Sequence, residues 1–360
     1  MIATTPNNPL RVGLIGYGYA GRTFHVPLIG AISGLALAAV ASSRPEVVAR
    51  ELPMVRVYRD PADLITNADV DVLVVASPND SHAQWTRMAI DAGRSVVVEK
   101  PFALSLSDAS ELVELAQKRG VLLSVFQNRR WDSDYLTVRR AIRSGVIGRV
   151  AHFESHFDRF RPEVRPRWRE RAGPGAGIWY DLGPHLVDQA LLLFGPPSAV
   201  TADLAILRGG GGSDDWAHAT LHYPDKRVVL HASMLVAGGS PRFTVHGERG
   251  SLLKTSPDPQ EEQLRAGLTP AHSEWGRDPD PLIAWNEAGQ RREEPAERGD
   301  QSQYYRAIEA ALRGAGENPT PAQQIIGCMA VIEACMEASR RGVTLRMPIC
   351  ARSAGAMHCQ

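Results

Sequence analysis

The sequence has little cysteine, no net charge and no long hydrophobic run, and each absence excludes a class of protein. Among 360 residues there are four cysteines, and no two of them form a C-x-x-C pair. This usage excludes a disulfide framework and fits a reducing compartment, so we expect a cytoplasmic protein. Basic and acidic side chains number 40 each, and a chain without net charge has no global field that attracts nucleic acid or an anionic membrane.

The longest uncharged run, residues 26–43, is too broken to span a membrane. Pro27, Gly30 and Gly34 interrupt its 18 residues, whereas a transmembrane helix needs about 20 apolar ones. The first ten residues lack the basic start and the apolar segment of a signal peptide. We therefore expect no membrane association. The 44% hydrophobic content is enough for two hydrophobic cores.

What the sequence does contain is a glycine-rich pattern near its start. The apolar run at residues 11–16 leads directly into G-x-G-x-x-G, as it does where a strand feeds a helix in a dinucleotide-binding fold. The first glycine permits a tight turn, the second lets a pyrophosphate approach the backbone, and the third packs the helix on the strand. Free N–H groups and the helix dipole then favour the phosphates. The expected phosphate loop comprises Gly16, Tyr17, Gly18, Tyr19, Ala20 and Gly21.

The end of the second predicted strand bears on the cofactor. An NAD site usually has Asp or Glu there, which bonds the ribose 2′-hydroxyl, but this chain has Ser42, Ser43 and Arg44. A carboxylate would repel a 2′-phosphate, whereas hydroxyls and a guanidinium bind one. The alternative is an ordinary turn before the next helix. We expect NADP rather than NAD.

Six apolar runs alternate with predicted helices through residues 1–130. The runs lie at residues 11–16, 35–41, 55–58, 70–77, 95–98 and 121–126. Strands that alternate with helices over short connections predict a doubly wound parallel sheet, that is, a Rossmann domain of the α/β class. Ligands bind such sheets at the carboxyl ends of the strands. The residues at those ends are Gly16, Ser42, Ser77, Lys100 and Gln127.

The alternation of predicted strands and helices ends after residue 131. Strand-like runs separated by turns lie at residues 150–157, 199–207, 217–223, 228–235, 242–246 and 251–254. We expect a second, α+β domain over residues 131–348 with a large open, mostly antiparallel sheet. Residues 256–300 are polar, which predicts a surface excursion with a little local structure, and residues 349–360 predict a loose tail.

The stretch from Gly173 to Asp188 combines a glycine-rich approach with an apolar helix. Asp181 and His185 are four positions apart, so they share one face of that helix. Three interpretations stay open from these residues: Asp181 is an N-cap beside a buried histidine, the two are metal ligands, or His185 is an acid/base group oriented by the carboxylate. Asp188 lies a turn deeper and is not expected to be catalytic.

Four motifs occur along the chain in the same order as in a known family. They are G-x-G-x-x-G at residues 16–21, S-P-N-x-x-H at 77–82, E-K-P at 99–101 and D-x-G-x-H at 181–185. Together they resemble the Gfo/Idh/MocA oxidoreductase family over residues 10–348. Three further segments, at residues 128–134, 154–162 and 177–182, are similar to the branch of NADP-dependent scyllo-inositol dehydrogenases.

The resemblance implies roles for individual residues. Lys100 would polarise the reacting carbon–oxygen bond, His185 would exchange the proton, and Asp181 would orient His185. The Lys100–Pro101 peptide is a candidate for the cis form. Cofactor contacts are implied for Ser77, Pro78, Asn79, His82, Glu99, Lys100 and Asn128. Substrate contacts are expected for Asn128, Arg129, Asp158 and Trp179. No metal is expected.

The expected function is hydride transfer between NADP and a hydroxyl of a cyclic polyol or sugar. The resemblance also implies a homodimer or homotetramer that uses the open sheet. Two rival functions on this scaffold are a dinucleotide-dependent glycoside hydrolase and a cofactor-binding sensor without chemistry. The arginine-rich segment at residues 158–171 predicts an ion-paired surface loop or a lid that offers guanidinium groups to the substrate.

Overall fold

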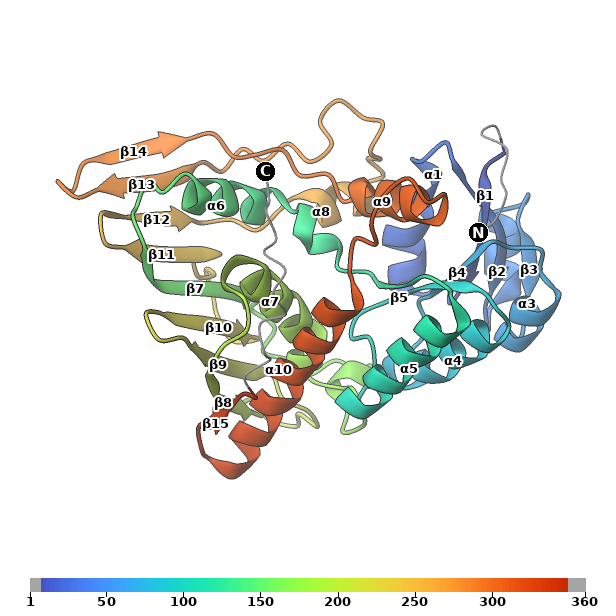
Figure 1. Ribbon diagram of the computed structural model, residues 1–360, viewed down its shortest axis with the longest axis horizontal. Coiled ribbons are helices and arrows are strands. Elements are labelled where there is room, and N and C mark those ends of the chain that lie inside the picture. The colour runs from blue at the N-terminus through green and yellow to red at the C-terminus, as the bar shows by residue number, and fades with distance from the viewer. Residues whose placement is uncertain (1–7, 349–360) are drawn as a thin grey trace.

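The computed structural model describes residues 8–348, and the expected tail at 349–360 lies outside the described residues. Two sheets organise the chain, and they lie at opposite ends of the molecule in Figure 1. The first sheet is wholly parallel and has the order β3-β2-β1-β4-β5-β6. Its strands are β1 (Leu10–Ile15), β2 (Leu35–Ala41), β3 (Arg56–Tyr58), β4 (Val72–Val75), β5 (Ser95–Val98) and β6 (Leu123–Val125). This is the doubly wound Rossmann sheet that the alternation predicts.

The central strands form because their residues are apolar on both faces. All four residues of β4 are buried, as expected for a parallel strand covered by helices on both sides. The crossover segments bring the chain back over the sheet and place every strand's carboxyl end at one edge. They are η1 (Gly21–His25), α1 (Val26–Gly30), α2 (Pro45–Glu51), α3 (Pro61–Asn67), η2 (Asn79–Ser81), α4 (His82–Asp91) and α5 (Leu106–Arg119).

The second sheet has nine strands in the order β14-β13-β12-β11-β7-β10-β9-β8-β15. Neighbouring strands are antiparallel except for the central pair β7 and β10, which is parallel. The strands are β7 (Val150–Asp158), β8 (Ala199–Ala205), β9 (Trp216–His222), β10 (Arg227–Ser233), β11 (Phe243–Gly247), β12 (Gly250–Lys254), β13 (Leu282–Asn286), β14 (Arg291–Glu294) and β15 (Leu345–Arg346). A large, mostly antiparallel sheet was expected here.

The expected local structure in residues 256–300 is present, but the description of this segment as a surface excursion was wrong. This segment contains helix α8 (Gln260–Arg265) and the strands β13 and β14, which extend one edge of the second sheet. The apolar side chains of β13 alternate over only five residues, so their signal is diluted by the charged residues around them. Pairing with β12 decides the outcome, because β12 presents an edge that a strand can cover.

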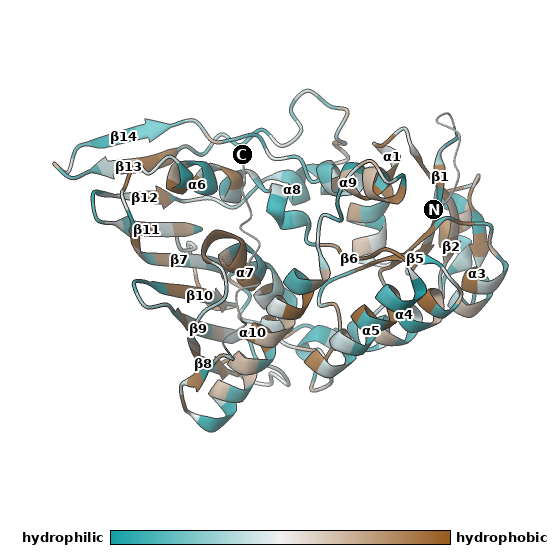
Figure 2. Cartoon of the chain, in the orientation of Figure 1, coloured by the Kyte–Doolittle hydropathy of each residue, from teal (hydrophilic) through white to brown (hydrophobic). Residues whose placement is uncertain are grey.

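Helices cover one face of the second sheet. They are α6 (Ser133–Arg143), α7 (Ile178–Phe194) and α10 (Ala322–Arg341). Along β7 the buried residues Phe153, Ser155 and Phe157 face these helices, and the half-buried side chains between them are polar and face the other side. Figure 2 shows hydrophobic residues concentrated on α7 and the strands beneath it, whereas β14 at the sheet edge is hydrophilic.

The last helices of the chain return to the first sheet. Tyr304 and Tyr305 of α9 (Ser302–Leu312) belong to the core beneath β1, and Ile325 of α10 belongs to the core on its other side. We keep a domain division near residue 130 as a proposal, with these helices joining the two parts. Short one-turn helices, η3 (Asn128–Trp131) and η4 (Trp168–Glu170), lie in the connecting segments. No helix within residues 8–348 is long and apolar enough to cross a membrane.

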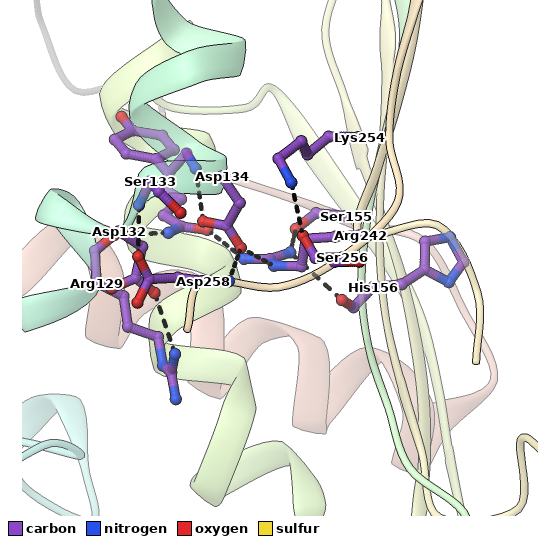
Figure 3. A network of polar contacts seen from close by, with 12 residues as sticks. Arg129, Asp132, Ser133, Asp134, Ser155, His156, Arg242, Lys254, Ser256 and Asp258 are labelled. Carbon is purple, nitrogen blue, oxygen red and sulfur yellow. Dashed lines mark hydrogen bonds and ion pairs between the residues drawn. The ribbon is translucent and has the colours of Figure 1, made fainter. Parts of the chain in front are cut away.

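A buried charge network fixes α6 against the second sheet. The Arg242 guanidinium donates to Asp134 at 3.0 Å and to Ser155 Oγ at 2.5 Å, and both ionic side chains are almost inaccessible to solvent. Figure 3 shows these groups converging from β7, α6 and the segment before β11. Because a buried charge that lacks its partner is destabilising by several kcal/mol, roughly 3–5, the network defines how α6 sits on the sheet.

Candidate active site

A cavity of about 410 Å³ opens at the carboxyl edge of the first sheet. It lies where the connections after β1, β2, β4 and β5 meet, which is the place expected for a ligand of an open α/β sheet. The expected cofactor residues that line it are Gly16, Tyr17, Gly18, Tyr19, Ala20, Ser42, Ser43, Arg44, Ser77, Pro78, Asn79, His82, Glu99 and Lys100.

The three glycines of the loop have different surroundings. Gly16 has a φ of +102°, and a Cβ there would lie 2.4 Å from the carbonyl oxygen of Ala76. A Cβ on Gly21 would lie 2.2 Å from the carbonyl oxygen of Gly16, so this glycine lets the helix approach the loop. A Cβ on Gly18 would meet no protein atom within 4 Å. The space beside Gly18 therefore belongs to the cavity, as the phosphate-loop pattern requires.

The far end of the cavity is basic. Ser42, Ser43 and Arg44 line it together with Arg59, which follows β3. No ion pair involving either arginine is found within residues 8–348. Arg59 was missed from the sequence, because only the pairing of β2 with β3 brings it beside Arg44.

Several expected cofactor residues are also tied to the protein. His82 contacts the carbonyl oxygens of Ser77 and Pro101 at 2.9 and 2.8 Å, and Asn79 donates to the carbonyl oxygen of Gly175 at 3.0 Å. Glu99 contacts the buried His25 at 3.0 Å. These bonds hold the turns around the cavity and connect one of them to the glycine-rich approach of α7.

Lys100 joins the two sheets at the inner end of the cavity. It follows β5 in the turn that contains the cis Lys100–Pro101 peptide, as the resemblance implied. Its Nζ donates to the main-chain oxygen of Asp181 at 2.6 Å and to the Asp181 carboxylate at 3.4 Å. The lysine thus lines the dinucleotide-sized cavity and touches α7 of the second domain at once.

Helix α7 begins at Ile178, with Gly177 at the N-cap position. The interpretation of Asp181 as the N-cap is therefore wrong. Asp214 caps the helix instead, since its carboxylate accepts from the N–H of Trp179 at 2.8 Å. A cap 35 positions along the chain leaves no local sequence pattern, and it frees Asp181 to face the cavity from the first turn.

The Asp181 carboxylate lies among cations. Besides Lys100, its oxygens are 3.8 Å from Arg159 and 3.5 Å from Arg169. These neighbours outweigh burial and hold the pKa of Asp181 well below its usual range. Within residues 8–348 no hydrogen bond joins Asp181 to His185, so its carboxylate is engaged with Lys100 instead of orienting the imidazole.

His185 is buried one turn further along α7, and its Nδ1 has no hydrogen-bond partner among the described residues. Burial lowers its pKa well below 6.5, and the positive charges of Lys100 and Arg129 lower it further. Burial also lowers the pKa of Lys100, although the Asp181 carboxylate opposes this change. Burial and the neighbouring cations thus favour the neutral form of His185, whereas the Asp181 carboxylate favours the charged form of Lys100.

Arg129 and Phe157 form the wall beside His185. The Phe157 ring lies 6.4 Å from the imidazole, centroid to centroid, and the Arg129 guanidinium lies 5.1 Å from the Phe157 centroid. Arg129 also donates to Glu261 of α8 at 2.9 Å, and Glu261 accepts from Tyr19 of the phosphate loop at 2.7 Å. Glu261 was missed because its segment was read as a surface excursion.

Three expected substrate residues do not reach this site. Asn128 is buried and donates to Gln301 at 3.0 Å, and Trp179 is buried in the second core, where its indole donates to the carbonyl of Ile332. Asp158 follows Phe157 in β7 and so faces the opposite side of the sheet. We leave all three out of the proposed site. Asp188 pairs with Arg130.

Some arginines of the segment at residues 158–171 fit the interpretation as a lid, and others fit the interpretation as an ion-paired surface loop. Arg159 and Arg169 approach Asp181, as a lid would, whereas Arg167 pairs with Glu170 in the surface loop. The sequence named the segment but could not select these members, because strand alternation and the η4 turn decide which side chains face the cavity.

Substitutions of Gly16 and Gly18 should differ in their effect on stability, because the two glycines have different surroundings. We expect Gly16→Ala to lower the free energy of unfolding by roughly 2 kcal/mol or more, since the added Cβ overlaps a backbone carbonyl at positive φ. Gly18→Ala should change it by less than about 0.5 kcal/mol, because the added methyl enters the cavity. Denaturant unfolding measures both, and equal losses would contradict these placements.

Comparison with known proteins identifies the fold and the family. Residues 10–127 match the oxidoreductase-family NAD-binding Rossmann model, and residues 139–347 match the C-terminal alpha/beta domain model of the same family. The chain is 50% identical to the oxidoreductase YdgJ of Escherichia coli (strain K12) over 93% of its own length and 98% of that protein. It is 35% identical to scyllo-inositol 2-dehydrogenase (NADP(+)) IolW of Bacillus subtilis (strain 168), over 94% and 96% of the two chains.

A crystal structure of an oxidoreductase from Klebsiella pneumoniae superposes with a TM-score of 0.90 at 49% identity, over 95% of this chain and 96% of that one. These matches thus extend over most of this chain and most of each relative. The chain belongs to the Gfo/Idh/MocA oxidoreductase family and is an oxidoreductase with an NAD(P)-binding Rossmann domain.

Proposed function

We propose that this oxidoreductase is NADP-dependent and interconverts a secondary alcohol of a cyclic, inositol-like polyol or sugar with its ketone. The observation that carries the proposal is the position of Lys100, which lines the cofactor cavity and also bonds Asp181 beside His185. The name of the Bacillus subtilis relative supports both the substrate class and the nucleotide. The expectation of a cytoplasmic homodimer or homotetramer stays a prediction.

The residues divide the chemistry between them. When bound, the nicotinamide accepts the hydride from the alcohol carbon or returns it. The Lys100 ammonium donates to the substrate oxygen and stabilises the charge that develops there. Neutral His185 takes the hydroxyl proton during oxidation and returns it during reduction. Asp181 holds the ammonium in place through two contacts, of 2.6 and 3.4 Å.

The preference for NADP rests on the basic end of the cavity. Ser42, Ser43, Arg44 and Arg59 offer hydroxyl and guanidinium donors, and no carboxylate lines the cavity at that end. A 2′-phosphate would gain charge-assisted hydrogen bonds there. The 2′-hydroxyl of NAD would find no carboxylate acceptor.

Removal of either catalytic side chain tests the roles. Lys100→Met and His185→Ala should each lower turnover by at least about a hundredfold, because each removes a group that acts on the moving proton or charge. Dinucleotide binding, followed by fluorescence, should persist in both variants. Lys118→Met, on the exposed face of α5, is the matched control and should keep wild-type rates. Near-normal turnover of either catalytic variant would refute the assignment.

The nucleotide preference has its own test. Arg44→Ala should weaken NADP binding at least about tenfold, roughly 1.4 kcal/mol, and change NAD binding little, because only NADP carries the phosphate. Arg56→Ala removes a nearby exposed arginine that stacks on Tyr58 outside the cavity, and it should leave both affinities unchanged. Equal losses of NAD and NADP in Arg44→Ala, or an NAD-preferring wild type, would overturn this part.

Both the acid limb and the alkaline limb of the pH profile for alcohol oxidation should lie at lower pH than the ordinary pKa values of histidine and lysine predict. His185 must be neutral, and burial lowers its pKa, so kcat/KM should fall only well below pH 6.5. Lys100 must be protonated, and burial lowers its pKa too, so the alkaline fall should begin below 10.5. Initial rates from pH 5 to 10 give both limbs. An acid limb at or above 6.5 would contradict the buried, neutral histidine.

A further inference from the structure

A second group of titratable side chains lies on the face of the nine-stranded sheet that points away from the active site. His156 and Asp158 are two positions apart in β7, so they share this face. His231 of β10 pairs directly with His156 in the register of the two parallel strands. One nitrogen or oxygen from each residue lies within 4.8 Å of the other two. The backbone register alone thus gathers two imidazoles and a carboxylate.

The buried Asp158 carboxylate is only partly satisfied by the protein, through His156 and the Ser240 hydroxyl. Its side chain is 2% exposed, and its Oδ1 has no hydrogen-bond partner among the described residues. His231 Nε2 lies 3.6 Å from that oxygen, and the same imidazole also contacts the main chain of Ala217. Buried polar atoms are ordinarily satisfied, so the open position at Oδ1 indicates a missing cation or donor.

The orientation of the His156 ring also indicates a missing cation. Its Nε2 lies 3.0 Å from Glu154 Oε2, which fixes the proton of the neutral ring on Nε2. The lone pair of Nδ1 then faces Asp158 Oδ2 at 3.3 Å, and two lone pairs at this distance repel unless a cation lies between them. Figure 3 shows the His156 ring turned away from the Arg242 network, on the other side of the strand, so no guanidinium of that network fills the gap.

A proton is the smallest cation that could do so. On His156 it would bridge to Oδ2, and the two carboxylates raise the pKa of this histidine against the effect of burial. It would leave Oδ1 unsatisfied, however. A metal ion satisfies all three residues. Ligands about 2.0–2.1 Å from a tetrahedral zinc ion lie about 3.3 Å from each other, close to the 3.3 and 3.6 Å separations found here.

We propose that His156, Asp158 and His231 form a binding site for a divalent transition-metal ion of the Zn²⁺ class. Two imidazoles and a carboxylate are ligands that such ions prefer, and three protein ligands leave a further position for water. Glu154 supplies the carboxylate that orients a ligating histidine and increases its basicity. The site is separate from the Lys100 centre, because Asp158 and Phe157 point to opposite faces of β7.

The proposal is tested with the full chain, freed of any affinity tag and treated with a chelator. Co²⁺ and Zn²⁺ are the probes: visible absorption follows Co²⁺, and calorimetry follows Zn²⁺. We expect about one ion per chain, with Zn²⁺ displacing Co²⁺. Asp158→Asn and His231→Gln should each weaken binding at least about tenfold, and Glu154→Gln should weaken it less. Thermal unfolding checks that each variant folds, and His156→Gln replaces any that does not.

His246→Gln is the matched control, because His246 is an exposed histidine on the same face that stacks on His152. It should bind Co²⁺ as the wild type does. Substoichiometric binding to the wild type would overturn the proposal and assign the gap to a proton on His156. Loss of binding in His246→Gln equal to that in Asp158→Asn would also overturn it, since it would show adventitious binding to surface histidines.

Discussion

The active centre depends on one contact, the bond between the Lys100 ammonium and Asp181. Lys100 extends from the end of a Rossmann strand, and Asp181 lies in the first turn of a helix on the other sheet. Neither domain contains the site alone. The contact joins the cofactor cavity to the helix that carries His185, so the proposed chemistry lies at the seam between the two sheets.

The charge balance of this seam explains the state of its histidine. Lys100, Arg159 and Arg169 surround the Asp181 carboxylate, and the positive charges of Lys100, Arg129 and Arg159 add to burial in lowering the pKa of His185. A neutral imidazole is ready to accept a proton. In the proposed mechanism the same potential favours a substrate oxygen that becomes negative as the hydroxyl proton leaves.

Strand β7 carries two different groups of side chains on its two faces. Phe157 faces His185 and Arg129, whereas His156 and Asp158 face the opposite side with His231. The period of two along a strand makes this separation complete, since neighbouring side chains cannot share a face. The resemblance placed Asp158 in the substrate pocket, and the pleat of the strand places it in the histidine cluster instead.

Local patterns in the sequence determined the Rossmann alternation and the phosphate loop, because each depends on residues close together in the chain. The pairing of E-K-P with D-x-G-x-H came from the family resemblance, since the two motifs lie far apart in the sequence. Only the tertiary structure placed Arg59 and Arg169 at the cavity, joined Glu261 to Arg129 and Tyr19, and replaced the expected Asp181 cap with Asp214. It also made β13 and β14 part of the sheet. These outcomes depend on strand register and on contacts across 30 or more positions, and such contacts leave no periodic signal in a single sequence.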